Sequence, residues 1–404
     1  MKKILLLGGS SQQVIAIETA KRLGYYTVLC DYLPDNPGQY EVDKFYLLST
    51  TDKDAVLEVA KDEKIDGVIA YASDPAAPTA AYIAEKMGLS GNPYKSVDIL
   101  CNKDKFRKFL KENGFCTPNA KGYTTSGSAL IDLKSGKFQF PIIVKPVDSS
   151  GSKGVTVLYD LEGIDKAFEF ALSFSRRRRV IIEEYIEKKH PYLIGGDIFV
   201  LNGQVVMWGL MNCHRDLNVN PLVPVGKSYP PLLVIEDLQT VKNTLQKIVT
   251  DLGFQNGCMN IELVVDKHNR VFLIDIGPRA GGNMIPDLCG YIFGVDVIEM
   301  AVKAVMGEEI FYHENKEKLY YATHNLHSTQ EGIFDHIELS KEIEKFVIKK
   351  CIFKKNGDRI ECFDNASKCL GVIFMKFGDE EEMKYILNRI NNYVSVKLEG
   401  GGNA

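Results

Sequence analysis

Apolar and polar positions alternate in two ways along the first hundred residues. Short apolar runs have the length of buried strands, and the stretches between them carry apolar residues at helical spacing. In chain order these strands and helices are predicted at 3–7, 12–23, 26–30, 53–63, 67–71 and 78–87. Strands that alternate with helices imply right-handed crossovers, so residues 1–100 are predicted to form a parallel, doubly wound α/β sheet.

The pattern changes after residue 100. A charged amphipathic helix is predicted first, and a smaller α+β unit, two strands, a long helix, a hairpin and a last helix follow it. Their predicted positions are 102–113, 120–186, 198–201 and 205–210, 235–252, 259–265 with 271–276, and 295–306. Residues beyond about 319 are expected to form a separate, small α+β cap that ends in a glycine-rich tail.

Composition excludes several classes of protein. The 49 Lys and Arg against 53 Asp and Glu give a formal net charge of −4, which argues against a coat for nucleic acid or an anionic membrane. No apolar run reaches the roughly 18 residues that cross a bilayer, and the run after Met1 is too short for a signal peptide. Nine cysteines without a CxxC pair are typical of reduced thiols, so we expect a cytoplasmic protein.

A glycine turn, Gly8-Gly9, lies between the first predicted strand and helix and could offer N–H groups to a phosphate. With Asp31 as a ribose-binding acid, it could form a dinucleotide site. However, Ser10 and Gln13 replace the later glycines of the G-x-G-x-x-G fingerprint. A tight turn without a ligand explains the pattern at least as well, and a dehydrogenase is disfavoured.

Lys145 interrupts an apolar predicted strand, and the serine- and glycine-rich segment 149–155 follows it. A buried lysine needs an anionic partner, and the segment is rich in donors that could cover phosphates. A hairpin with an exposed loop and a snorkelling lysine explains the same residues equally well.

Acidic residues interrupt both strands of the predicted hairpin, Glu262 on the first and Asp275 on the second. Neighbouring antiparallel strands could direct both carboxylates to one point, where two like charges need a cation. Oxygen ligands without Cys or His favour Mg²⁺ over zinc, and Arg279 could bind a phosphoryl oxygen. Surface acids on a half-exposed hairpin are the alternative, which the glycine-rich segment 280–283 weakens.

A fourth segment, 180–187, runs from a strand into a loop whose backbone could hydrogen-bond an adenine. In this order and spacing the four features resemble the ATP-grasp superfamily of ligases, of the biotin carboxylase, carbamoyl-phosphate synthetase and amino-acid ligase type. The resemblance implies an ATP-grasp fold, α/β and α+β, behind a Rossmann-like pre-ATP-grasp domain. The implied pre-ATP-grasp domain, connecting helix, small subdomain, large subdomain and C-terminal α+β cap are 1–100, 101–118, 119–187, 188–318 and 319–404.

The resemblance also implies roles for residues. Lys103, with Lys105 as a register alternative, and Lys145 would bind the phosphates of ATP, and Arg279 would steady an acyl phosphate, which makes Lys145 and Arg279 the catalytic residues. Glu262 and Asp275 would hold Mg²⁺, or Mn²⁺ in its place. The other implied nucleotide contacts, in the phosphate-covering loop and the adenine hinge, are Ser149, Ser150, Gly151, Ser152, Gly154, Val155, Glu183, Glu184, Tyr185 and Ile186.

Three positions depart from the family pattern. Gly277 stands where the family usually has a metal-binding asparagine, so water or the amide of Asn283 would complete the metal shell. Asp275 replaces the commoner glutamate, and no ribose-binding acid is obvious, Asp197 being the nearest. Gly277 keeps open a regulatory module that binds ATP without turnover.

The implied reaction has two steps. A substrate carboxylate attacks the γ-phosphate of ATP to give an acyl phosphate and ADP, and an amine then displaces phosphate. The expected function is an ATP-dependent carboxylate–amine ligase with small-molecule substrates, no membrane or nucleic-acid partner, and the homodimeric state common in the family. A kinase that stops after phosphorylating its substrate is the alternative enzyme.

The acceptor site is the least constrained by pattern. The candidates are polar residues that follow predicted strands or lie in the glycine-rich segment: Ser73, Asp74, His214, Arg215 and Asn283. A turn that starts a helix is the alternative for Asp74. His324 and His327 would face opposite sides of a strand, so no metal pair is expected there.

Overall fold

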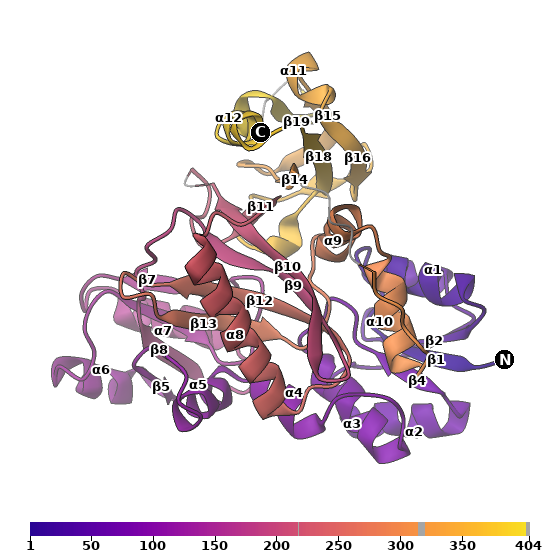
Figure 1. The fold of residues 1–404 in the computed structure, drawn as a ribbon. Helices are drawn as coiled ribbons and strands as arrows, with labels where there is room; N and C mark the ends of the chain where they lie inside the picture. The colour runs from indigo at the N-terminus through magenta and orange to yellow at the C-terminus, as the bar shows by residue number, and fades with distance from the viewer. Residues whose placement is uncertain (217, 314–319, 401–404) are drawn as a thin grey trace.

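The computed structural model describes residues 1–216, 218–313 and 320–400. The N-terminal part, drawn in indigo to purple in Figure 1, forms the predicted parallel sheet. Its strand order is β3-β2-β1-β4. Its elements are β1 (Lys3–Leu7), α1 (Val14–Arg22), β2 (Tyr26–Asp31), β3 (Lys44–Leu47), α2 (Lys53–Glu63), β4 (Gly67–Ile69), α3 (Ala77–Met87) and α4 (Tyr94–Leu100). Helix α1 packs on one face of the sheet, and α2 and α3 pack on the other. The sequence pattern did not predict β3 or α4.

The next part is a four-stranded antiparallel sheet in the order β5-β8-β6-β7. Helix α5 (Lys103–Glu112) leads into it, and its elements are β5 (Ala120–Tyr123), α6 (Ser126–Lys134), β6 (Ile142–Pro146), β7 (Thr156–Leu158), α7 (Ile164–Ser173) and β8 (Val180–Glu184). Val144 and Ile182 pack with Phe168 of α7. Because side chains alternate along a strand, the neighbouring residues Lys145 and Glu183 point to the other face.

An eight-stranded antiparallel sheet forms the centre of the molecule, in the order β13-β12-β9-β10-β11-β14-β18-β16 (Figure 1). Its first five strands and the helices that follow them are β9 (Leu193–Leu201), β10 (Gln204–Arg215), β11 (Pro224–Tyr229), α8 (Ile235–Leu252), β12 (Gly257–Val265), β13 (Val271–Gly277), α9 (Ile285–Phe293) and α10 (Val297–Val305). Helix α8 covers one face, and α9 and α10 pack on the other, between this sheet and the N-terminal domain.

The C-terminal segment is not the separate cap that the sequence pattern predicted. Strands β14 (Tyr320–Leu326), β16 (Val347–Ile352) and β18 (Gly371–Phe377) extend the central sheet, because β14 pairs with β11. The rest forms a small sheet with two helices, namely β15 (Gly332–Leu339), α11 (Lys341–Glu344), β17 (Arg359–Ile360), α12 (Glu380–Leu387) and β19 (Val394–Leu398). The predicted boundary at 318/319 and the last residues of the glycine-rich tail lie outside the described residues.

Polar contacts at the two ends of α1 fix the N-terminal domain to the central sheet. Arg22 forms ion pairs with Asp296 at 2.7 Å and Glu299 at 2.9 Å, beside α10. At the other end, the Gln12 side chain accepts a hydrogen bond from the Asn283 N–H at 2.6 Å and donates one to its Oδ1 at 3.1 Å. In the described ranges no helix has the length and apolar character needed to cross a bilayer.

Candidate functional site

Glu262 and Asp275 are direct register partners on β12 and β13. Opposite residues of an antiparallel pair project from the same face with Cβ atoms about 5 Å apart, so the two carboxylates share one location. Both side chains keep about a third of their surface exposed, at 30% and 33%. The structure therefore brings together the two acids that the hairpin pattern singled out, and leaves them accessible.

Lys103, at the start of α5, reaches this carboxylate pair. Its Nζ lies 3.1 Å from Asp275 Oδ2 and 3.0 Å from the carbonyl oxygen of Ser149. Burial alone would raise the pKa of Asp275, but the charges of Lys103 and Lys145 outweigh burial and lower it. Lys105, the register alternative, instead pairs with Asp98 at the surface. Lys103 is thus the lysine that faces the site.

Glu183 is the centre of a buried ionic cluster behind the carboxylate pair. Its carboxylate lies 2.7 Å from Lys145 Nζ and 2.8 Å from Arg107 Nε, and Arg107 also donates to the carbonyl oxygens of Leu273 and Ile274. Burial would raise the pKa of Glu183, but the two cations lower it to about 2. Arg107 was not predicted from the sequence. The signal that could have indicated its burial is its position on the predicted helix between two apolar residues, Phe106 and Leu110, which are fully buried in the structure.

The glycine-rich loop after β6 lies between the four-stranded sheet that contains β6 and the C-terminal segment. Gly151, Ser152 and Gly154 have positive φ angles of 68°, 61° and 73°, a region that glycine adopts without strain. Ser152 Oγ donates to the carbonyl oxygen of Leu222 at 2.8 Å, and the Ala366 N–H donates to Gly151 O at 3.4 Å. The loop therefore adopts a defined conformation beside Lys103.

The hinge segment after β8 offers limited backbone groups. The Glu184 N–H donates to Asn119 O at 2.9 Å and the Tyr185 N–H to Pro141 O at 2.9 Å. Glu184 can therefore meet a base only through its carbonyl oxygen. Within the described residues the Ile186 N–H has no acceptor, so it is available as a donor.

Arg279 is paired with Asp74 of the N-terminal domain rather than left free. Asp74 Oδ1 and Arg279 Nε are buried without a hydrogen-bond partner in the described part of the chain. A Cβ atom at Gly277 would lie 2.6 Å from Asp74 Oδ1 and 3.0 Å from the Arg279 guanidinium carbon. The glycine at this position therefore makes room for the Asp74–Arg279 pair.

The other predicted site residues take structural positions. Asp197 is fully buried and accepts hydrogen bonds from Asn260 Nδ2 at 2.7 Å and the Gly281 N–H at 2.8 Å, so it anchors the segment after β13. The carbonyl oxygen of Ser73 accepts a hydrogen bond from the N–H of Ala77 at the start of α3. Asn283 is engaged with Gln12 and not with Glu262 or Asp275.

His214 and Arg215 do not act together, because consecutive residues of β10 project from opposite faces. Arg215 lies on the face of the carboxylate pair, with its guanidinium 3.9 Å from Glu262 Oε1. His214 lies on the other face, where its Nε2 is 2.8 Å from Ser228 Oγ and its ring packs against Tyr192. Of the expected pair, the structure brings only Arg215 to the site.

The turn after β1 is closed by its own side chains. The Gly9 N–H donates to Asp31 Oδ2 at 2.7 Å, and the Ser10 N–H donates to Gln13 Oε1 at 2.9 Å. Gln13 also donates to the carbonyl oxygen of Tyr71 at 2.8 Å. The backbone N–H groups of this turn are therefore satisfied by acceptors inside the protein, which supports the tight-turn interpretation over a dinucleotide site.

The expectation that His324 and His327 face opposite sides of a strand was wrong. Strand β14 ends at Leu326, so the alternation of side chains does not extend to His327, and the two rings lie 5.5 Å apart. His327 Nε2 lies 3.5 Å from Asp216 Oδ2. Even so, the described residues contain no group of three or more His, Cys, Asp or Glu side chains placed to hold a metal ion.

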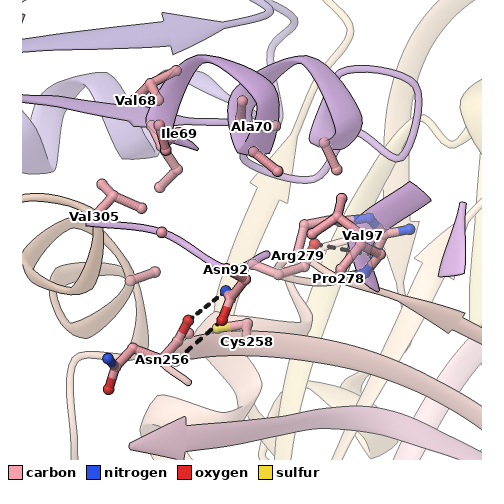
Figure 2. Close-up of a pocket in the computed structure, with 18 of the residues that line it drawn as sticks. Val68, Ile69, Ala70, Asn92, Val97, Asn256, Cys258, Pro278, Arg279 and Val305 are labelled. Atoms are coloured by element: carbon pink, nitrogen blue, oxygen red, sulfur yellow. Dashed lines mark hydrogen bonds between the residues drawn. The ribbon is translucent and has the colours of Figure 1, made fainter. Parts of the chain in front are cut away.

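An apolar cavity of about 90 Å³ lies between the N-terminal domain and the central sheet, beside Arg279 (Figure 2). Alanine and valine account for about half of the residues that line it, and Pro278 and Arg279 close one side. None of Lys103, Lys145, Glu262 and Asp275 lines it. The cavity therefore borders the site at Arg279 and is not a nucleotide pocket.

The donor set of the site fits a magnesium nucleotide. The two carboxylates supply only oxygen, which suits a hard cation that keeps waters and phosphate oxygens as its other ligands. Lys103 and Arg215 now neutralise Asp275 and Glu262, as a divalent cation there would. Lys103 and Lys145 are the cations that would face phosphates.

The chain resembles large chains of carbamoyl phosphate synthases in sequence. Residues 102–312 match the family model of the carbamoyl-phosphate synthase L chain, ATP binding domain. The large chain of Clostridium beijerinckii is 23% identical over 302 residues, which are 74% of this chain and 27% of that protein. The C-terminal section of the large chain of Aquifex aeolicus is 24% identical over 345 residues, 80% of this chain and 62% of that protein.

Solved structures share the fold over almost the full chain. The L-amino acid ligase of Bacillus licheniformis has a TM-score of 0.78 at 20% identity and covers 99% of both chains. The phosphoribosylglycinamide synthetase of Anaerococcus prevotii has a TM-score of 0.77 at 23% identity, over 98% of this chain and 100% of that one. The biotin carboxylase domain dimer of the Hydrogenobacter thermophilus 2-oxoglutarate carboxylase, solved with MgADP and bicarbonate, scores 0.75 at 16% identity, over 98% and 92%. The predicted ATP-grasp fold is confirmed.

Proposed function

Because the chain belongs to the family of the carbamoyl-phosphate synthase large-chain ATP-binding domain, we propose that it is an ATP-dependent carboxylate–amine ligase. The observation that carries the proposal is the partly exposed pair Glu262 and Asp275, with Lys103 joining it to the glycine-rich loop. The chain spans 27% of the length of the first curated relative. The substrates of that longer protein are therefore not assigned to this chain.

The nucleotide is placed between the two sheets. Lys103 and Lys145 neutralise its phosphates, and the loop 149–155 covers them with N–H groups and hydroxyls. The base lies against the hinge, where the carbonyl oxygen of Glu184 accepts from the adenine amino group and the Ile186 N–H donates to a ring nitrogen. Glu183 holds Lys145 in place and stays ionised because of Arg107.

Glu262 and Asp275 are the residues that would hold Mg²⁺, or Mn²⁺ in its place. A bound divalent cation would neutralise phosphate oxygens and orient them for transfer. Water would complete the shell of such a cation, because Gly277 offers no side chain and Asn283 is bound to Gln12. The metal-bound form of the biotin carboxylase domain dimer supports this cofactor set.

The acid lies between the γ-phosphate and Arg279. Its carboxylate attacks the γ-phosphorus to form an acyl phosphate and ADP, and Arg279 steadies the charge that develops. The amine then attacks the carbonyl carbon and phosphate leaves, which forms an amide. Closure of the loop 149–155 excludes water from the acyl phosphate.

We also propose a compartment and an oligomeric state for the enzyme. All nine cysteines are free thiols, which fits a reducing compartment, and we place the protein in the cytoplasm. We also propose a homodimer, on the example of the biotin carboxylase domain dimer. Light scattering after gel filtration measures the mass and decides between dimer and monomer.

An ADP-release screen over carboxylic acids, with and without a pool of amines, tests the ligase. We expect release of both ADP and phosphate only when an acid and an amine are present together. Lys145→Ala and Glu262→Ala are expected to abolish release, whereas Glu338→Gln, at an exposed acid on β15, leaves it unchanged. Turnover with one acceptor and no free phosphate would identify a kinase instead, and tight ATP binding without ADP would identify a regulatory module.

A further inference from the structure

Lys227 on β11 is a buried cation that the nucleotide site does not use. Only 6% of the residue is exposed, and its Nζ has one hydrogen-bond partner in the described part of the chain, the Cys213 thiol at 2.7 Å. Each of the other cations of the site faces a carboxylate: Lys103 faces Asp275, Lys145 and Arg107 face Glu183, Arg279 faces Asp74, and Arg215 faces Glu262. A buried ammonium without a counter-ion is costly, so its position needs an explanation.

The side chain of Lys227 runs across the central sheet toward the carboxylate pair. Lys227 is the register partner of Cys213 on β10, and its Nζ ends over β9, 3.1 Å from where a Cβ of Gly195 would stand. Only a glycine leaves this space free, since the same Cβ would lie 2.8 Å from Cys213 Sγ. The ammonium therefore lies on the face of β9 that Gly195 leaves open.

Gly195 is in turn the register partner of Glu262. The ammonium of Lys227 thus lies about one strand spacing, roughly 5 Å, from the strand that carries Glu262. Lys103 approaches the carboxylate pair from the opposite side, through Asp275 on the edge strand β13. The order across the sheet is Lys103, Asp275, Glu262 and then Lys227.

This order separates the two anions of the reaction. The triphosphate lies on the Lys103 side of the carboxylate pair, so an anion on the Lys227 side is the other reactant. We infer that Lys227 binds the carboxylate of the acid substrate and the acyl phosphate that forms from it. The buried Asp197 of β9 acts on Lys227 only through space: its oxygens accept from Asn260 Nδ2 and the Gly281 N–H, and among the described residues it forms no ion pair with Lys227. This inference rests on the proposed ligase function.

Lys227→Met tests the inference with two probes. In this variant we expect the KM for an acid found in the ADP-release screen to rise about tenfold or more, as for loss of a charged hydrogen bond. The KM for ATP should stay within about threefold of the value for the unchanged protein. Calorimetric titration of inorganic phosphate into the MgADP-bound protein should show the same rise in Kd, with MgADP affinity unchanged. Lys227→Arg, which keeps the charge, is expected to recover most of the affinity for both probes.

Lys189→Met is the matched control, because Lys189 pairs with Asp237 away from the carboxylate pair. It should leave both probes unaffected even if it lowers the melting temperature. If Lys227→Met does not fold, Lys227→Gln carries the same expectations. Unchanged binding of acid and phosphate would overturn the inference, and an equal rise in the KM for ATP would assign Lys227 to the triphosphate instead. If no acid supports ADP release, the ligase proposal fails, while the phosphate titration still decides the role of Lys227.

Discussion

Asp74 and Arg279 form an ion pair that joins the N-terminal domain to the end of β13, and Gly277 lies directly beneath it. The asparagine that the resemblance implies at position 277 would place its Cβ atom against both partners. The absence of a side chain at this position is therefore explained by the space that the ion pair needs. The pair also fixes the guanidinium where the proposed acyl phosphate forms.

Gly277→Ala is expected to displace the Asp74–Arg279 pair, since the added Cβ would lie 2.6 Å from Asp74 Oδ1. We expect it to destabilise the protein by about 1–3 kcal/mol, as other overpacking substitutions do, and to lower turnover. Urea denaturation of Gly277→Ala, Asp74→Ala and the double variant measures the coupling. The double variant should be less destabilised than the sum by about 1 kcal/mol or more. Simple additivity would show that Gly277 does not make room for the pair.

Glu183→Gln removes the one carboxylate that neutralises Lys145 and Arg107 in the buried cluster. Two buried cations then lack a counter-ion, and we expect a loss of about 3–5 kcal/mol in the free energy of unfolding. Glu184→Gln is the matched control, because its side chain accepts hydrogen bonds from the Gln139 N–H and Asn119 at the surface. It should cost about 1 kcal/mol or less. Equal losses in the two variants would contradict the central position of Glu183.

Lys103→Met and Lys105→Met separate the two registers of the phosphate-binding lysine. Lys103 lies 3.1 Å from Asp275, whereas Lys105 pairs with Asp98 at the surface. We expect the KM for ATP, or the Kd for MgADP, to rise about 10- to 100-fold in the first variant and to change little in the second. A larger change in KM or Kd for the Lys105 variant would contradict this assignment and place the triphosphate on the other side of α5.

His324 makes stability depend on pH. Burial, with repulsion from His327, lowers the pKa of His324 from 6.5 to about 3; Asp216 and His214 are the other titratable groups that act on it. As the pH falls, this histidine is protonated in the unfolded chain before it is protonated in the folded protein. Its contribution to the free energy of unfolding is therefore fully present above pH 6.5 and is lost as the pH falls toward 3. The slope is about 1.4 kcal/mol per pH unit for one histidine.

Burial also lowers the pKa of His214 to about 4, so both histidines contribute between pH 6 and 4.5. Urea denaturation over this range should show the free energy of unfolding falling with decreasing pH. His324→Asn is expected to remove about 1.4 kcal/mol per pH unit from that slope. A slope that does not respond to His324→Asn would contradict its burial in the neutral form.

Much of the site was predictable because its signals are local. An acid among aliphatic residues on each strand of a hairpin, as at Glu262 and Asp275, follows from alternation and a short turn. A lysine inside an apolar strand, as at Lys145, indicates a buried charge. The same alternation places His214 and Arg215 on opposite faces of a strand, which argues against a shared role for the two side chains.

The remaining parts depend on contacts between segments far apart in the chain. Arg107 looked like one more charge on an amphipathic helix, and only the packing of α5 against β8 and β13 makes it the partner of Glu183. Lys227 lies on β11, a strand that the pattern did not predict, and its relation to Glu262 passes through Gly195. The partner of β14 was equally hidden, because no local pattern specifies which strand another pairs with.

That pairing gives the C-terminal segment a role in solubility. If the chain were cut before β14, then β11 would become an exposed edge with unpaired backbone groups, and such edges template aggregation. The newly exposed strand would be the one that carries Lys227. A truncated chain ending near residue 313 is therefore better regarded as an opened sheet than as an isolated nucleotide-binding domain.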